Sequence, residues 1–309
     1  MYYLDNYRQR PEWSDKIFRT GKFKLPLSKN RNREYKIKPG QRIRVNMTSD
    51  TFIEEAAAWM PEFWDIISRR PDVIFWLLTK RPERIAQSLP PNWNDGYENV
   101  SLNITTENQA MFDIRWPVFE QVPAKHKGIC CAPLIGPLDI TPALQSGQIE
   151  EVSAGGENYD NPRPADYNWF AALSTQCAAH RTNFCWYESG TKFVYQGRQG
   201  FWPRKADQSA IAYFSRQNLK FYEPEYKLFD PTDGRHLKPE ELYQHKYNAN
   251  HCTFCSNRML CNGCLNCGDC CSKPVLVDLQ TLWQIEDQIL KTDPPRVYRA
   301  YILQEPGPF

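Results

Sequence analysis

The feature that most limits the fold of this chain is a regular alternation of short apolar runs with helix-length segments. Apolar, β-branched or aromatic runs begin 23 to 33 residues apart, at 43–47, 73–78, 100–104, 128–131, 151–154 and 184–187. The stretches 54–70, 107–121 and 166–180 between them have the lengths, cap residues or apolar spacing of helices. Strands that alternate with helices form a parallel sheet with helices outside it. The predicted fold class of residues 1–215 is therefore α/β.

Polar or glycine residues follow nearly every predicted strand. They are Ser49, Asp50, Thr79, Lys80, Arg81, Glu107, Asn108, Gly155, Gly156, Glu157 and Glu188. An open doubly wound sheet collects its site residues at one crevice, whereas a barrel collects them from many strand ends at one mouth. The distribution favours a partial or complete (β/α) barrel with a ligand pocket at the mouth. Helix capping by Ser, Thr, Asp and Asn accounts for some of these residues.

The chemistry of these side chains suits a polar ligand. Lys80 and Arg81 can hold a carboxylate or phosphate, and arginine can do so through two parallel hydrogen bonds. Gly155 and Gly156 let a ligand approach the backbone closely. Four carboxylates can accept hydrogen bonds from an amine, a ribose or a base edge: Asp50, Glu107, Glu157 and Glu188. The alternative for Lys80, Arg81 and Glu107 is mutual ion pairing across the barrel mouth.

Seven of the eleven cysteines lie within twenty residues: Cys252, Cys255, Cys261, Cys264, Cys267, Cys270 and Cys271. A segment with so little apolar material cannot fold by burial, and metal binding to thiolates supplies the missing free energy. Four of them have the C-x2-C-x2-C-x3-C spacing of a ferredoxin-type 4Fe–4S cluster: Cys261, Cys264, Cys267 and Cys271. The alternative is a four-thiolate zinc site built from two C-x2-C pairs, Cys252/Cys255 and Cys261/Cys264. We therefore predict a small C-terminal metal-binding subdomain at 251–274.

The rest of the chain is ordinary for a globular protein. Residues 216–250 are predicted to be a linker or small subdomain, and 275–309 an amphipathic helix with a loose tail. The longest apolar run, 73–78, is far shorter than a membrane span, and MYYLDNYRQR lacks a signal-peptide core. We therefore expect a cytoplasmic protein without a membrane partner and without disulfides. The other four cysteines are expected to be small buried hydrophobic residues: Cys130, Cys131, Cys177 and Cys185.

A basic arm spans residues 16–44. It holds eleven Lys/Arg and one acid, a local net charge of +10 against +2 for the whole chain. Its aromatic residues Phe18, Phe23 and Tyr35 could stack on bases while its cations track phosphates, so nucleic acid is a predicted partner. The alternative is a solvated loop that balances the acidic remainder. The predicted contact residues are Lys22, Lys24, Lys29, Arg31, Arg33, Lys36 and Lys38.

Five segments in order carry a resemblance to a known family: SDTFIEEAAAWMPEFWDII, LLTKRPERI, NVSLNITTENQ, APLIGPLDI and AGGE. They resemble an uncharacterised phage and bacterial family of radical-SAM-like proteins that is recognised by a three-cysteine motif. The resemblance covers about residues 1–215. It implies a radical-SAM-type partial barrel, a 4Fe–4S cluster on three cysteines near the N-terminus, and pocket residues at the strand ends from Ser49 to Glu157. It implies no settled substrate.

The chain departs from that family at two places. No cysteine precedes Cys130, and Ala132 stands where the family usually has a glutamate before Pro-Leu. A radical-SAM cluster uses three thiolates on one loop, which leaves one iron open for the amino and carboxylate groups of S-adenosylmethionine. Since the matched region begins at Met1, we expect the cysteine loop upstream of it. The alternative is a degenerate member without radical chemistry.

Two functional hypotheses follow. The first is a radical-SAM-like iron–sulfur protein with an auxiliary C-terminal cluster and a redox partner, which is an S-adenosylmethionine-dependent enzyme if the upstream loop exists. The second is a zinc-stapled nucleic-acid-binding or regulatory protein without catalysis. A carboxylate-based barrel hydrolase or lyase ranks last, because the sequence has neither an HExxH motif nor a Ser-His-Asp arrangement.

Overall fold

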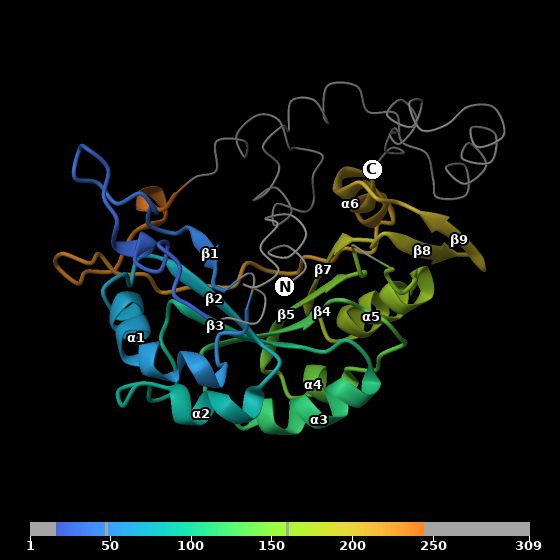
Figure 1. The fold of residues 1–309 in the computed structure, drawn as a ribbon, viewed down its shortest axis with the longest axis horizontal. Helices are drawn as coiled ribbons and strands as arrows, with labels where there is room; N and C mark the ends of the chain where they lie inside the picture. The colour runs from blue at the N-terminus through green and yellow to red at the C-terminus, as the bar shows by residue number, and fades with distance from the viewer. Residues whose placement is uncertain (1–16, 47–48, 159–160, 244–309) are drawn as a thin grey trace.

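The computed structural model describes residues 17–46, 49–158 and 161–243, and its centre is a parallel sheet (Figure 1). The sheet consists of β1 (Arg42–Arg44), β2 (Ile74–Thr79), β3 (Val100–Thr105), β4 (His126–Cys131), β5 (Ile149–Gly155) and β7 (Asn183–Glu188). The spatial order is β1-β2-β3-β4-β5-β7, and every neighbouring pair is parallel. All six predicted strands are confirmed, although β1 ends at Arg44 rather than at residue 47.

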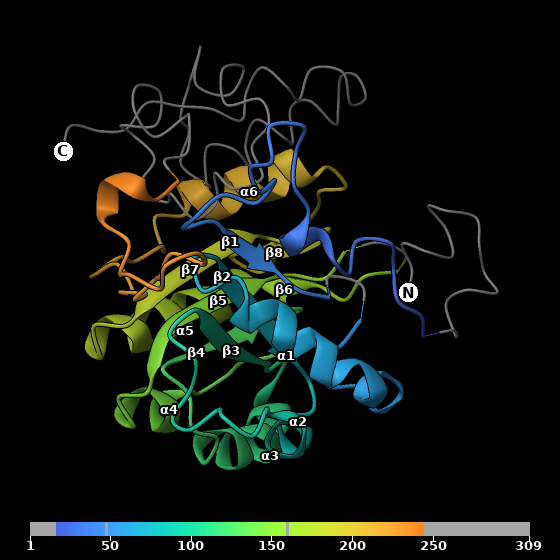
Figure 2. The same ribbon diagram turned by 90° about the vertical axis from the view of Figure 1, so that its left-hand side faces the viewer.

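The order of the strands explains why the sheet curls. In a doubly wound sheet the strand order reverses and helices cover both faces. Here each strand is added beside the previous one, and five helices cover one face (Figures 1 and 2): α1 (Met60–Ser68), α2 (Ile85–Ser88), α3 (Gln109–Glu120), α4 (Thr141–Gln145) and α5 (Tyr167–Ala179). Twist that accumulates in one direction curls the sheet into a half-barrel, concave on the side away from these helices. The prediction of an α/β fold with a partial parallel barrel is confirmed.

The main hydrophobic core lies between the convex face of the sheet and these helices. Alternate strand residues point into it, such as Leu77 of β2 and Leu102 of β3, and they meet Phe112 and Phe119 of α3. The predicted helix at 54–70 is confirmed as a 3₁₀ turn, Glu54–Trp59, that continues into α1. The four scattered cysteines are buried free thiols, as expected: Cys130, Cys131, Cys177 and Cys185. Burial raises the pKa of Cys177 and of Cys185 to about 12.

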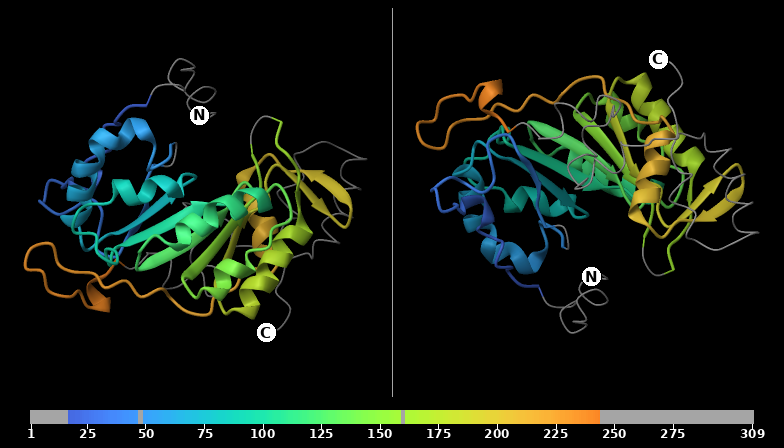
Figure 3. Two further views of the ribbon diagram at one scale, coloured as in Figure 1. Left: turned by 90° about the horizontal axis from the view of Figure 1, so that it is seen from below. Right: turned by 90° about the horizontal axis from the view of Figure 1, so that it is seen from above.

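Residues 216–243 form a floor across the amino-terminal ends of the strands. After α6 (Lys205–Phe214) the chain turns back, and Leu219 pairs with Phe184 at the start of β7. Farther on, Tyr226 stacks on His126 at the start of β4, with ring centroids 4.0 Å apart. Figure 3 shows this segment running along the sheet to its orange end. At that end the amide of Tyr243 donates a hydrogen bond to the carbonyl of Pro39 at 2.7 Å. This part of the predicted linker therefore packs on the half-barrel.

The remaining predicted segments lie outside the described residues. These are residues 244–250 of the linker, the cysteine-rich segment 251–274, and the helix and tail at 275–309. In the described part of the chain, no helix has both the length and the apolar character that a bilayer crossing requires.

A small second sheet flanks the carboxyl half of the chain. Its order is β6 (Ala165–Asp166), β8 (Lys192–Tyr195) and β9 (Arg198–Phe201), with β8 and β9 antiparallel. The two-residue turn between them, Gln196 and Gly197, has positive φ at both positions, as a tight hairpin requires. Phe193 of β8 is fully buried against Phe170 of α5 and Trp186 of β7, so this sheet is attached through aromatic packing.

The basic arm is folded onto the half-barrel rather than free, and a buried arginine holds it there. Arg70 is 0% exposed and forms two 2.8 Å hydrogen bonds with the carboxylate of Asp72, which is 1% exposed. Its guanidinium also donates to the carbonyls of Pro26 and, at 2.7 Å, Ile37. The same group lies 3.9 Å from the ring centroid of Tyr35. One side chain thus fixes three points of the arm.

Candidate functional site

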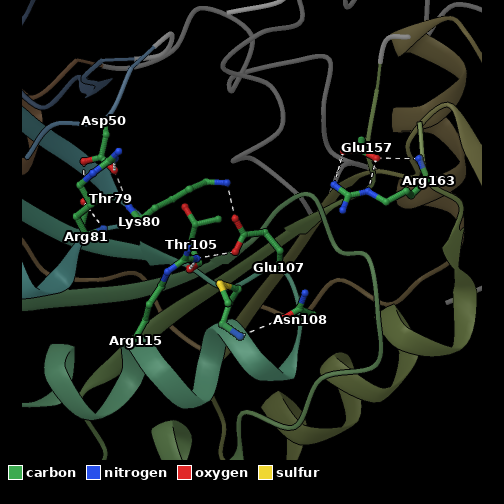
Figure 4. Close-up of polar contacts among 11 residues, drawn as sticks. Asp50, Thr79, Lys80, Arg81, Thr105, Glu107, Asn108, Arg115, Glu157 and Arg163 are labelled. Carbon is green, nitrogen blue, oxygen red and sulfur yellow. Dashed lines mark hydrogen bonds and ion pairs between the residues drawn. The ribbon is translucent and has the colours of Figure 1, made fainter. Parts of the chain in front are cut away.

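The loop after β1 is tied to the end of β2 by Asp50 (Figure 4). One carboxylate oxygen accepts hydrogen bonds from the Thr79 hydroxyl (2.7 Å) and the Phe52 amide (2.9 Å). The other accepts from the Lys80 amide (2.8 Å) and the Arg81 guanidinium (3.0 Å). These four donors use the acceptor capacity of the carboxylate. Asp50 and Thr79 therefore shape the mouth, and Lys80 and Arg81 project from it.

Glu107, just beyond β3, lies at the centre of the mouth (Figure 4). Its carboxylate contacts Lys80 Nζ and, at 2.5 Å, Arg115 of α3, which also donates to the Thr105 carbonyl. The Glu107 side chain is 10% exposed, whereas that of Lys80 is 50% exposed. Burial raises the pKa of Glu107, but Lys80 and Arg115 outweigh burial and hold that pKa below its usual value. Glu107 is therefore ionised and anchors an accessible ammonium group.

Two more carboxylates hold cations on the other side of the mouth. Glu157 accepts two hydrogen bonds from the Arg163 guanidinium, at 2.6 and 2.8 Å, and these bonds are the main reason that its pKa is lowered. Glu188 at the end of β7 accepts from Asn158 (2.8 Å) and Lys205 (2.5 Å). Arg163 and Lys205 are exposed while their carboxylate partners are mostly covered.

The mouth thus has a consistent pattern in which covered acids hold exposed bases outward. Mutual ion pairing, which the sequence offered as the alternative for Lys80, Arg81 and Glu107, is present in the structure. Ion pairing does not remove these cations from ligand binding, because half of the Lys80 side chain remains accessible. An anionic ligand can bind the same cations from the solvent side while the carboxylates hold them in place.

Two other predicted pocket residues lie at the mouth in different roles. Asn108 is the N-cap of α3, and its side-chain oxygen accepts a hydrogen bond from the Met111 amide at 3.0 Å. This contact is the capping role that the sequence offered for some strand-end residues. Ser49 is exposed in the loop after β1, where its amide donates to the Asn46 carbonyl. No side chain or carbonyl of the described residues binds its hydroxyl group, which can therefore contact a ligand.

The glycine pair at the end of β5 lies against the chain itself. A Cβ on Gly155 would come within 2.7 Å of the Tyr187 ring, and a Cβ on Gly156 would overlap the carbonyl oxygen of Ser189. The amide of Gly156 donates to the carbonyl of Glu188 at 3.0 Å, which joins the ends of β5 and β7. The absence of side chains at these glycines is therefore needed for packing between two strands.

Sequence reasoning missed four cations of this face: Arg44, Arg115, Arg163 and Lys205. Arg115 lies inside a helix and Lys205 opens another, so nothing in the local sequence marks them as mouth residues. Arg163 lies in a Pro-rich turn whose direction the sequence does not reveal. Arg44 had a signal, because it lies within the first predicted strand, 43–47, but it was counted with the basic arm.

No metal site can be assigned within the described residues. Among them, no group of three or more His, Cys, Asp or Glu side chains is arranged to hold an ion. The seven cysteines predicted as ligands, Cys252 to Cys271, lie outside the described ranges. The iron–sulfur and zinc alternatives therefore stay predictions.

Comparison with known proteins gives a family match and no individual relative. A family model described as "Protein of unknown function (DUF5131)" matches residues 6–240, which is more than half of the chain. No curated protein and no solved structure matches it. The matched range includes all six strands of the half-barrel and most of the floor segment.

Proposed function

The chain belongs to the DUF5131 family of proteins of unknown function, and we propose that it is a radical-SAM-like iron–sulfur protein that binds its ligand at the carboxyl face of the half-barrel. The observation that carries the ligand site is the convergence of charged side chains at the carboxyl ends of five of the six parallel strands: Asp50, Lys80, Glu107, Glu157 and Glu188. The iron–sulfur part of the proposal rests on the cysteine spacing. Cysteines 252–271 supply the cluster ligands. Use of S-adenosylmethionine requires a further three-cysteine loop, since no cysteine precedes Cys130.

The architecture supports a ligand site at this face. In parallel α/β barrels the loops after the strands build the active site, whereas the opposite end serves stability. Here the amino-terminal end is closed by the floor segment, and the carboxyl end carries exposed cations over carboxylates. A ligand with an anionic group and a hydrogen-bond donor fits this pattern, with Lys80 or Arg81 on the anion and Glu157 on the donor.

The position at which the described chain ends is compatible with a cluster that works at the mouth. Tyr243 lies beside Pro39, which precedes β1. Cys252 follows nine residues later, and nine residues span at most about 30 Å. A six-residue strand such as β2 is only about 20 Å long. The cysteines are therefore within reach of the carboxyl face.

Metal analysis tests the proposal directly. Protein purified without oxygen is expected to contain about four irons and as much acid-labile sulfide per chain. The double substitution Cys261→Ser, Cys264→Ser should remove both, together with the broad visible absorbance. Cys177→Ala is the matched control, since this thiol is buried in α5 and should leave the iron content unchanged. One or two zinc ions without sulfide would overturn the iron–sulfur assignment and favour a zinc-stapled protein.

Nucleic-acid binding by the basic arm is the second candidate function, and the presentation of the arm's cations favours it. Some cations are paired, because Glu62 contacts Arg19 and Lys24, and Glu34 contacts Lys38. Five others are exposed and have no carboxylate partner in the described ranges: Lys22, Lys29, Arg31, Arg33 and Lys36. Since the contacts of Arg70 with Pro26, Tyr35 and Ile37 fix the arm on the half-barrel, these charges lie on a folded surface rather than on a free tail.

Salt dependence tests this candidate. If all five exposed cations contact phosphates of a single-stranded oligonucleotide, the affinity should fall about 100-fold between 50 and 200 mM salt, because each contact contributes about −0.7 to the logarithmic slope. Arg31→Gln should reduce the slope by about 0.7. Lys227→Gln, which removes an exposed cation from the floor segment, should leave the slope unchanged. Equal behaviour of the two variants in filter-binding titrations would contradict a role for the arm.

A further inference from the structure

The concave face of the half-barrel carries an arginine that the mouth ion pairs do not involve. Arg44 is the last residue of β1. Its neighbour Ile43 packs against the core on the convex side, so strand alternation directs Arg44 to the concave side. The guanidinium carbon lies 4.9 Å from the ring centroid of Trp76 and 5.9 Å from that of Tyr187. Since β1 and β7 are the two edges of the sheet, Arg44 stands in the opening between them.

Arg42, two residues earlier on the same face, has a structural role, because its charge is paired within the protein. It forms a 3.0 Å ion pair with Glu151 of β5, and both side chains are mostly covered. Burial lowers the pKa of Arg42, but Glu151 outweighs burial and raises it. The amino-terminal layer of the concave face is therefore neutralised by the protein itself. Arg44 is exposed, and no carboxylate in the described ranges pairs with it.

The layer of side chains beside Arg44 on the concave face is polar rather than aliphatic. A complete barrel fills its interior with branched aliphatic residues, whereas this layer contains Tyr187, Ser153 and Cys130. Burial raises the pKa of Tyr187 well above its usual value and also raises that of Cys130, although Arg44 acts in the opposite direction on both. Both groups are therefore neutral near pH 7. Tyr187 keeps its position because Gly155, beneath its ring, has no side chain.

The charges around this opening do not balance. Among the described residues, six cations face it, and four carboxylates: Arg44, Lys80, Arg81, Arg115, Arg163 and Lys205 against Asp50, Glu107, Glu157 and Glu188. The surplus arises because two cations share Glu107 and no carboxylate in the described part of the chain pairs with Arg44. Two positive charges match a phosphate monoester, which carries about −1.5 to −2 at neutral pH, better than a single carboxylate. Arginine also presents a planar fork that fits phosphate oxygens.

We propose that Arg44 binds the phosphate group of a phosphorylated ligand on the concave face of the half-barrel. This inference rests on the proposed function, which places the ligand at this face, and it adds the chemical class of that ligand. Trp76 and Tyr187 hold the guanidinium in the opening from two sides, so its donors are positioned before the ligand arrives. Lys80, at the rim, supplies the second charge.

Thermal unfolding in the presence of inorganic phosphate or pyrophosphate tests this proposal. A ligand that binds only the native state stabilises it by RT ln(1 + [L]/Kd), so the apparent Kd can be fitted from the Tm over a series of ligand concentrations. Arg44→Met should weaken that Kd about 10- to 100-fold, since it removes charge-assisted hydrogen bonds. The apparent Kd of Arg44→Lys should lie between those of the wild type and of Arg44→Met. Arg31→Met, which removes another exposed arginine from the arm, should bind phosphate as the wild type does.

The controls make each outcome decisive. Phosphate also stabilises proteins by exclusion from their surface, but that effect is the same in every variant. An equal response of wild type and Arg44→Met, no response of the wild type, or the same response to acetate would overturn the proposal. Iron and sulfide should be unchanged in Arg44→Met. A wild-type protein that contains iron but does not respond to phosphate overturns this inference alone, whereas a wild-type protein that responds to phosphate but contains no iron overturns the proposed function alone.

Discussion

Replacing Arg70 with methionine is expected to destabilise the protein by about 3–5 kcal/mol. The substitution leaves the carboxylate of Asp72 buried without its counter-charge, and an isolated buried charge is far more costly than a paired one. It also leaves the carbonyls of Pro26 and Ile37 without their donor, so the basic arm loses its attachment. Urea unfolding followed by circular dichroism measures the free energy of unfolding. An unchanged m-value would show that the variant and the wild type expose similar surface areas when they unfold.

The neighbouring residue provides the matched control. Arg69 is exposed and reaches Asp65 only at 3.4 Å on the surface, so Arg69→Met should cost less than about 1 kcal/mol. The double variant Arg70→Met, Asp72→Leu should recover part of the loss, because the buried charge is gone but the two carbonyls remain unpaired. If the free energies of unfolding of Arg70→Met and Arg69→Met differ by less than about 1 kcal/mol, the contacts of Arg70 do not hold the arm on the half-barrel.

The strands could be predicted from sequence because the sheet leaves a pattern in it. The residues of the inner strands are mostly buried, so these strands appear as short apolar runs, and the helices between them set a nearly constant spacing. The floor segment leaves no such pattern. It touches the sheet through single residues, such as Leu219 on Phe184 and Tyr226 on His126. Contacts made one residue at a time have no period, so residues 216–243 resembled a linker.

The sequence indicated residues of the candidate site, but it did not indicate how they are arranged. Strand-end chemistry indicated Asp50, Lys80 and Glu107, and the structure brings them to one face. Their roles depend on partners 27 to 31 positions away, as in the pairs of Lys80 with Glu107 and Arg81 with Asp50. The same limit applies to Arg44. Charge counting placed it in a uniform basic segment, and only the fold separates paired, exposed and concave-face cations within that segment.

A second large effect is expected from Gly156→Ala, which should destabilise the protein by about 3 kcal/mol. A methyl group at this position would overlap the carbonyl oxygen of Ser189, and it would lie 2.7 Å from the Ser189 carbonyl carbon and 2.8 Å from the Gly190 Cα. These neighbours are backbone atoms of the segment that follows β7, so relief requires movement of a strand end rather than of a side chain. The free energy of unfolding in urea measures the effect.

Gly21→Ala is the control, because nothing lies within 4 Å of a Cβ at that position and its φ is not in the left-handed region. It should leave the stability unchanged or raise it by up to about 1 kcal/mol, since alanine restricts the unfolded chain. The comparison separates the two roles of the glycine pair. A Gly156→Ala protein with wild-type stability but no phosphate response would show that Gly156 makes room for a ligand. Loss of stability would show that the packing of the ends of β5 and β7 requires a residue without a side chain at this position.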